Sequence, residues 1–273
     1  MKNKILYILL ILTIAITSCK NSETDLALSE INHIKQLINE GQDSAALLRI
    51  DSIHTKFPKN IPIRRIADTL SWDIEYRHAI INLPNIDSSL TKLQERLPEL
   101  QKNFIFIKNE EYQTLGSFEH KKLRTENNTS RCYLKPSVNE FGKLTITSYY
   151  IGPKANHNLM RITADSLFVE SLIAPNSNIS QFLDMGNYHE IIVFDENTLN
   201  NTTEFITKYK DSRIKISLIG EGQPYHYYLT PTEREAFAQS YELAITISNI
   251  IHLTDLQLRL SQKIELLRIR LNK

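Results

Sequence analysis

The sequence predicts an α+β fold: an N-terminal helical bundle, an antiparallel helical stalk formed by two distant helices, and an inserted antiparallel β-sandwich-like head. Three observations support this. Apolar residues recur at helical spacing near both ends of the chain, apolar and polar residues alternate through the middle, and residues 232–273 contain neither Gly nor Pro.

The helical bundle is expected over residues 26–84, after a short polar tether at residues 19–25. Apolar residues from Leu28 to Ile38 share one helical face, and Gly41 is a suitable stop because glycine readily adopts the left-handed backbone that ends helices. A second helix is expected up to the sequence "KFPKN", and a third begins near Pro62.

Two later segments, residues 85–113 and 230–273, are expected to pair as the stalk. In the first, leucines alternate spacings of three and four, which is an a/d seam interrupted by Pro98. The second opens with "TPTE", a capping box with Thr230 as N-cap and Glu233 at N3. An apolar stripe on a helix of about 40 residues needs a partner to bury it, so the two segments should pack antiparallel.

The β-rich head is expected over residues 114–229. "GKLTITSYYIGP" alternates cleanly, and hairpins are predicted around residues 164–166 and 220–222. "EIIVFDEN" predicts a buried strand, and "NTTEFITKYKD" a short helix. Roughly seven strands of this kind predict an antiparallel sandwich.

The opening segment, "MKNKILYILLILTIAITSCK", predicts a secretory signal over residues 1–18. Lys2 and Lys4 precede an apolar run that is too short to span a bilayer comfortably. The run ends in Ile16-Thr17-Ser18-Cys19, which resembles the lipobox of bacterial lipoproteins of the Bacteroidota type. That resemblance implies cleavage before Cys19, acylation of Cys19 including palmitate-type chains, and anchoring in a membrane, with the outer membrane of a Gram-negative bacterium favoured by Lys20. An uncleaved anchor and an ordinary signal with a chance cysteine are the alternatives.

Charge and composition exclude several function classes. Loss of Lys2 and Lys4 with the signal leaves 30 basic against 31 acidic residues, which predicts no nucleic-acid partner. Seven glycines and the absence of phosphate-loop or metalloprotease motifs predict no cofactor. The eight histidines are scattered without metal-binding spacing, so no metal site is expected.

Candidate binding residues are five tyrosines on predicted strands of the head. Tyrosine on a sheet face stacks on sugar rings and offers a hydroxyl, although it also favours ordinary cross-strand pairing. The five are Tyr149, Tyr150, Tyr225, Tyr227 and Tyr228.

No catalytic residue is assigned. Cys132, the one thiol left after acylation of Cys19, alternates with Arg131 and Tyr133 in a pattern that favours a core position over a nucleophile. Ser166, in a predicted turn, is the best placed of four D-[S/T]-apolar tripeptides that resemble the O-glycosylation motif of Bacteroidota.

The chain is therefore expected to be a lipid-anchored cell-envelope protein, and a non-enzymatic binding or assembly subunit for a protein or glycan partner. The alternative is a secreted hydrolase or glycan-active accessory protein with a site on the β head. A third hypothesis is a homo-oligomer that forms through the C-terminal helix.

Overall fold

The computed structural model describes residues 23–111 and 113–272. The predicted signal and Cys19 lie outside the described residues. No helix in these two ranges is long and apolar enough to cross a membrane. The chain divides into two compact units, Met1–Asp87 with Leu256–Lys273, and Ser88–Asp255.

The first unit is helical. It contains a helix over residues 23–39, α2 (Asp43–Lys56), the first part of α3 (Ile61–Gln101) and the last part of α5 (Pro231–Leu271). Gly41 has φ 73° and follows the first helix, as predicted. The core of this unit is made of apolar side chains at helical spacing, among them Ala27, Ile31, Ile34, Ala46, Ile50, Ile53, Ile63, Ala67 and Ile74.

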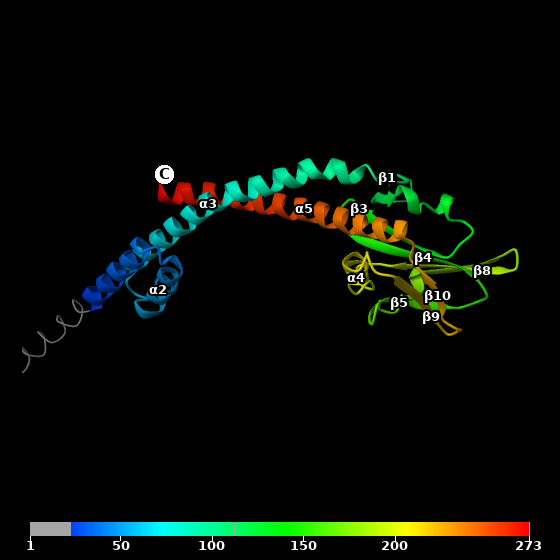
Figure 1. Ribbon diagram of the computed structural model, residues 1–273. Coiled ribbons are helices and arrows are strands. Elements are labelled where there is room, and N and C mark those ends of the chain that lie inside the picture. Colours follow the sequence, from blue (N-terminus) through cyan, green and yellow to red (C-terminus); the bar gives the residue numbers. More distant parts are fainter. Residues whose placement is uncertain (1–22, 112, 273) are drawn as a thin grey trace, which may run out of the picture. The chain divides into compact units, whose positions relative to one another are not determined.

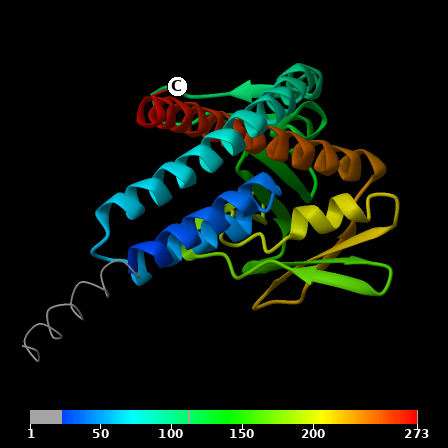
Figure 2. The same ribbon diagram turned by 90° about the vertical axis from the view of Figure 1, so that its left-hand side faces the viewer.

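α3 and α5 pair antiparallel within each unit (Figures 1 and 2). In the first unit, Lys263 Nζ lies 3.0 Å from Glu75 Oε2, and the Arg270 guanidinium lies 5.1 Å from the centre of the Trp72 ring. In the second unit, Arg96 forms an ion pair with Glu242. The predicted pairing of two distant helices is therefore present.

The boundaries of α3 differ from the prediction. The helix does not divide at residue 84 but continues through Pro84 and Pro98, and it ends at Gln101 rather than near 113. The residues after it form β1 (Phe104–Ile107), because their aromatic and β-branched side chains favour a strand and β2 (Ser117–His120) supplies a partner.

The second unit holds two antiparallel sheets. The six-stranded sheet has the order β1-β2-β3-β4-β8-β7, and the four-stranded sheet has the order β10-β9-β5-β6. The remaining strands are β3 (Tyr133–Asn139), β4 (Leu144–Gly152), β5 (His157–Ala164), β6 (Leu167–Glu170), β7 (Ile179–Asp184), β8 (Asn187–Phe194), β9 (Ile214–Gly220) and β10 (Tyr225–Tyr228). The α+β class with a β-rich region is thus confirmed.

Both sheets and α5 contribute to one core. Ile146 and Phe194 of the six-stranded sheet, Ile162 and Ile216 of the four-stranded sheet, and Phe237 of α5 belong to the same buried cluster. We call the face of the six-stranded sheet that enters this core its inner face, and the opposite face its outer face.

Local chemistry explains how the elements begin and end. The predicted capping box is present at α5: Glu233 N donates to Thr230 Oγ1 at 3.2 Å, and Thr230 N donates to Glu233 Oε2 at 2.7 Å. The predicted short helix is α4 (Thr202–Lys208). The β5–β6 turn passes through Asp165 with φ 52°, a left-handed conformation that Asp tolerates.

Candidate functional site

Cross-strand register brings two rows of side chains together on the outer face of the six-stranded sheet. Tyr133 of β3 lies opposite Tyr149 of β4, which lies opposite Ile191 of β8. Two residues further along β4, Ile151 lies opposite His189 of β8, and His189 lies opposite Phe182 of β7. These two rows form the floor of a pocket.

Two pairs of rings stack within these rows. Tyr133 and Tyr149 are nearly parallel, at 5° with 4.7 Å between ring centres. Phe182 and His189 are parallel to within 9° at 4.8 Å. The rings border a pocket of about 320 Å³, called here the Tyr133 pocket, which is at the small end of ligand sites. Its lining is completed by Thr125, Asn128, Thr129, Arg131, Tyr150, Ile151, Asp184 and Ile191.

One wall comes from the segment that precedes β3. Arg131 is held in place because its Nε donates to Asn128 Oδ1 at 2.8 Å and its Nη1 to Glu233 Oε1 at 2.9 Å. Its guanidinium lies 5.4 Å from the centre of the Tyr133 ring. A fixed arginine over a ring presents a rigid polar edge to anything that enters the pocket.

A buried cation supports the other tyrosine. Lys135 Nζ donates to Glu119 Oε1 at 2.8 Å and to Thr125 Oγ1 at 3.2 Å, and it lies 5.6 Å from the centre of the Tyr149 ring. Burial opposes the charge of Lys135, but Glu119 and Tyr149 outweigh it and raise the pKa of the ammonium group. Lys135 is therefore charged on the outer face, beside the pocket, at neutral pH.

The hydroxyl of Tyr133 is the unusual group in the pocket. Tyr133 is 1% exposed, and its hydroxyl makes no hydrogen bond to any described residue. Burial raises the pKa of Tyr133, and this effect outweighs the opposite effect of the nearby Thr125 hydroxyl, which stabilises the ionised phenol. A buried hydroxyl without a partner costs about 1–3 kcal/mol, and because this hydroxyl is itself covered, a ligand in the pocket reaches it only when the side chains over it move.

The structure separates the five tyrosines named from the sequence. Tyr149 is half-buried and lines the Tyr133 pocket. Tyr150 points to the inner face, where its hydroxyl donates to Pro153 O at 2.8 Å. Tyr225 and Tyr227 pack against the core, and Tyr228 is 47% exposed on β10 beneath the guanidinium of Arg213.

The sequence assigned no binding role to the other pocket residues. Tyr133, Arg131, Phe182, Asp184 and His189 lie on three strands or beside them, and only the register of those strands brings them together. The sequence signal that could have pointed to this pocket was the alternation around Cys132, which places Arg131 and Tyr133 on the same face of a strand.

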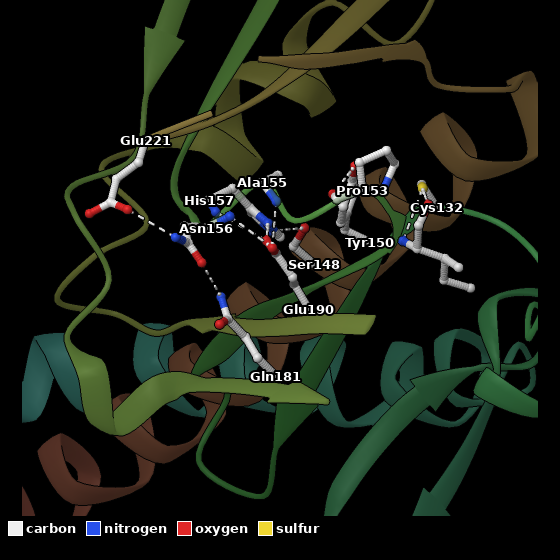
Figure 3. Close-up of polar contacts among 11 residues, drawn as sticks. Cys132, Ser148, Tyr150, Pro153, Ala155, Asn156, His157, Gln181, Glu190 and Glu221 are labelled. Carbon is white, nitrogen blue, oxygen red and sulfur yellow. Dashed lines mark hydrogen bonds and ion pairs between the residues drawn. The ribbon is translucent and has the colours of Figure 1, made fainter. Parts of the chain in front are cut away.

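On the inner face, Ser148, His157 and Glu190 form a connected network (Figure 3), called here the Glu190 network. Ser148 Oγ lies 3.0 Å from His157 Nε2, and His157 Nδ1 lies 2.6 Å from Glu190 Oε2. Because an ionised carboxylate only accepts, Nδ1 carries the proton. The connectivity is that of a serine-hydrolase triad with glutamate as the third member.

The remaining contacts of Glu190 indicate a structural role. Its carboxylate also accepts the backbone N–H groups of Ala155, Asn156 and His157, at 2.8, 2.7 and 3.1 Å. Burial raises the pKa of Glu190, but the hydrogen bonds from His157 and from these amides outweigh burial and lower the pKa to about 2. The ionised carboxylate fixes the β4–β5 loop.

The network is closed to solvent. Ser148, His157 and Glu190 are each 0% exposed. The backbone is also tightly packed here: a Cβ atom at Gly220 would lie 2.1 Å from the carbonyl oxygen of Asn156, so no space is left between the two segments. A substrate carbonyl has no route to Ser148 Oγ in this arrangement, so the geometry does not support acyl transfer.

Cys132 lies just before β3 and is half-buried against the core. Ile151 N donates to its Sγ at 3.3 Å. A hydrogen bond with the thiol, together with burial, raises the pKa of Tyr225 to about 12. These contacts are those of a packed cysteine. Within the described ranges no group of His, Cys, Asp and Glu is arranged to hold a metal ion.

Comparison with protein-family models, with curated proteins and with solved structures finds no match for the chain.

Proposed function

We propose that this protein is a lipid-anchored protein of the cell envelope, held in the outer membrane through Cys19, and that it binds a glycan without chemical turnover. A sugar ring of that glycan occupies the Tyr133 pocket. The anchoring part of the proposal rests on the lipobox-like sequence at residues 16–19.

The observation that carries the binding function is the Tyr133 hydroxyl. It is buried without a hydrogen-bond partner, beside rings that remain partly exposed. A sugar suits both features, because its C–H face packs on Tyr149 and its hydroxyls can both donate and accept. Arg131 and Asp184 at the pocket edge add one donor group and one acceptor group.

Enzymatic turnover receives less support from the pocket. Its acidic lining residue is Asp184, whereas glycoside hydrolysis uses two carboxyl groups facing each other across about 5–9 Å. A ligand held there is bound by stacking and hydrogen bonds.

The binding function is tested with a chain of residues 20–273 on an array of bacterial and host oligosaccharides, followed by titration calorimetry with the best ligand. Tyr149→Ala is expected to weaken binding at least ten-fold. Tyr228→Ala, which removes an exposed tyrosine from the other sheet, is the matched control and should leave affinity unchanged. Equal losses in both variants, or no bound glycan on the array, would refute the proposal.

The anchor is tested separately by mass spectrometry of the native protein. The expected N-terminal peptide begins at Cys19 and carries acyl chains. An intact Met1, or an unmodified Cys19 thiol, would contradict the anchoring part and leave the binding part standing.

A further inference from the structure

We propose that the free edge of β7 pairs with β7 of a second copy of this chain, so that two six-stranded sheets join into one continuous sheet. This inference does not depend on the proposed function. It rests on the length, backbone geometry, side chains and charge of β7.

The described residues form four edge strands, and β7 is the longest of them. It has six residues, whereas β1, β6 and β10 have four each. Its register with β8 is continuous from Ile179 to Asp184, without a bulge. Natural proteins protect such edges with charged residues, above all lysine, with proline, with bulges or with short length, and of these features β7 has only the charge of Asp184 at its end.

The backbone groups that face the free edge follow from the hairpin. Met185 and Gly186 form a two-residue turn with φ 46° and 82°, so Asp184 and Asn187 are the closely spaced, hydrogen-bonded pair. Hydrogen-bonded and non-hydrogen-bonded pairs then alternate. The N–H and C=O groups of Ile179, Gln181 and Leu183 therefore point away from β8.

The side chains of β7 leave apolar surface exposed on both faces. Phe182 is 50% exposed on the outer face, and Leu183 is 63% exposed on the opposite face. Met185 at the hairpin tip is 95% exposed. An unpaired strand edge that carries exposed apolar side chains on both faces favours addition of another strand.

One antiparallel register uses all three of these positions. With Gln181 opposite Gln181 of the second copy, Leu183 lies opposite Ile179, and each pair exchanges backbone hydrogen bonds. Asp184 is the only charged residue of β7. In this register it lies opposite Asn178 of the second copy rather than opposite its own equivalent, so like charges do not meet.

The pairing has a geometric consequence for the Tyr133 pocket. The two copies are related by a two-fold axis perpendicular to the sheet, so both outer faces point the same way. Phe182, which lines the pocket, lies on that face. A dimer therefore presents two pockets on one side of a continuous sheet.

The test is sedimentation velocity of residues 20–273 over a wide concentration range, up to about 1 mM. The wild-type chain is expected to form dimers in a concentration-dependent way. Leu183→Lys is expected to weaken dimerisation at least ten-fold, while Leu167→Lys on the β6 edge, at a position 52% exposed, should not. Both positions are exposed, and circular dichroism checks that both variants fold.

The register is tested with Gln181→Cys in a Cys132→Ala background. Hydrogen-bonded antiparallel pairs have Cα atoms about 5.5 Å apart, within the range of a disulfide. Gln181→Cys should therefore form a disulfide-linked dimer on mild oxidation, and Ser180→Cys should do so far more slowly.

A wild-type chain that stays monomeric throughout would overturn the proposal. So would dimers that survive Leu183→Lys but are lost in Leu256→Lys/Leu260→Lys, since this outcome would place the contact on α5. Because Leu183 faces away from the pocket, Leu183→Lys leaves the glycan contacts of the proposed function intact.

Discussion

Two polar centres lie on opposite faces of β4, one residue apart. Ser148 on the inner face belongs to the Glu190 network, in which a fully buried carboxylate accepts hydrogen bonds from three backbone amides and a histidine. Tyr149 on the outer face borders the Tyr133 pocket, where a buried hydroxyl has no partner among the described residues. The satisfied groups of the Glu190 network stabilise the fold, whereas the Tyr133 hydroxyl, buried without a partner beside partly exposed rings, is the contact that the proposed glycan site would use.

The largest expected effect is that of Glu190→Ala. The substitution leaves the amides of Ala155, Asn156 and His157 without their acceptor inside the protein, and each stranded group costs about 1–3 kcal/mol. We expect the free energy of unfolding in urea to fall by roughly 3–5 kcal/mol. A loss below about 1 kcal/mol would show that the network does not hold the β4–β5 loop.

The second effect is a pH dependence with a defined sign. The pKa of Glu190 is lowered from its ordinary 4.5 to about 2 by folding, so its contribution is complete above pH 4.5 and is lost as the pH falls toward 2. The wild-type chain should lose roughly 2 kcal/mol more than Glu190→Gln between pH 6 and pH 3, measured by urea unfolding at both values. Parallel pH profiles for the two chains would contradict the assignment.

Ser148→Ala should have a smaller effect. It removes the hydroxyl that contacts His157 Nε2 at 3.0 Å and leaves one ring nitrogen without a partner. We expect a loss of about 1–2 kcal/mol in unfolding free energy and unchanged glycan affinity. Loss of binding without loss of stability would instead indicate a functional serine.

Tyr133→Phe should have the smallest effect on stability, and of the opposite sign. The substitution removes a buried hydroxyl that lacks a partner, so the unfolding free energy should stay constant or rise by up to about 1 kcal/mol. Glycan affinity should nevertheless fall about ten-fold by calorimetry, because the ligand loses that contact. A clear destabilisation of the unliganded chain would mean that the hydroxyl already has a partner, and the pocket would lose its main support.

Short-range patterns in the chain were enough to predict individual helices, strands and turns. Alternation predicted β4, the capping box predicted the start of α5, and Gly41 predicted the end of the first helix, because these signals depend on residues close together in the chain. The continuation of α3 through Pro84 was missed, since the paired α5 supports it from far along the sequence. Which faces of distant strands coincide could be seen only in the folded chain. The placement of Tyr133 against Tyr149, and of Glu190 beneath the β4–β5 loop, follows from strand register, which the packing of the whole core fixes rather than any local pattern.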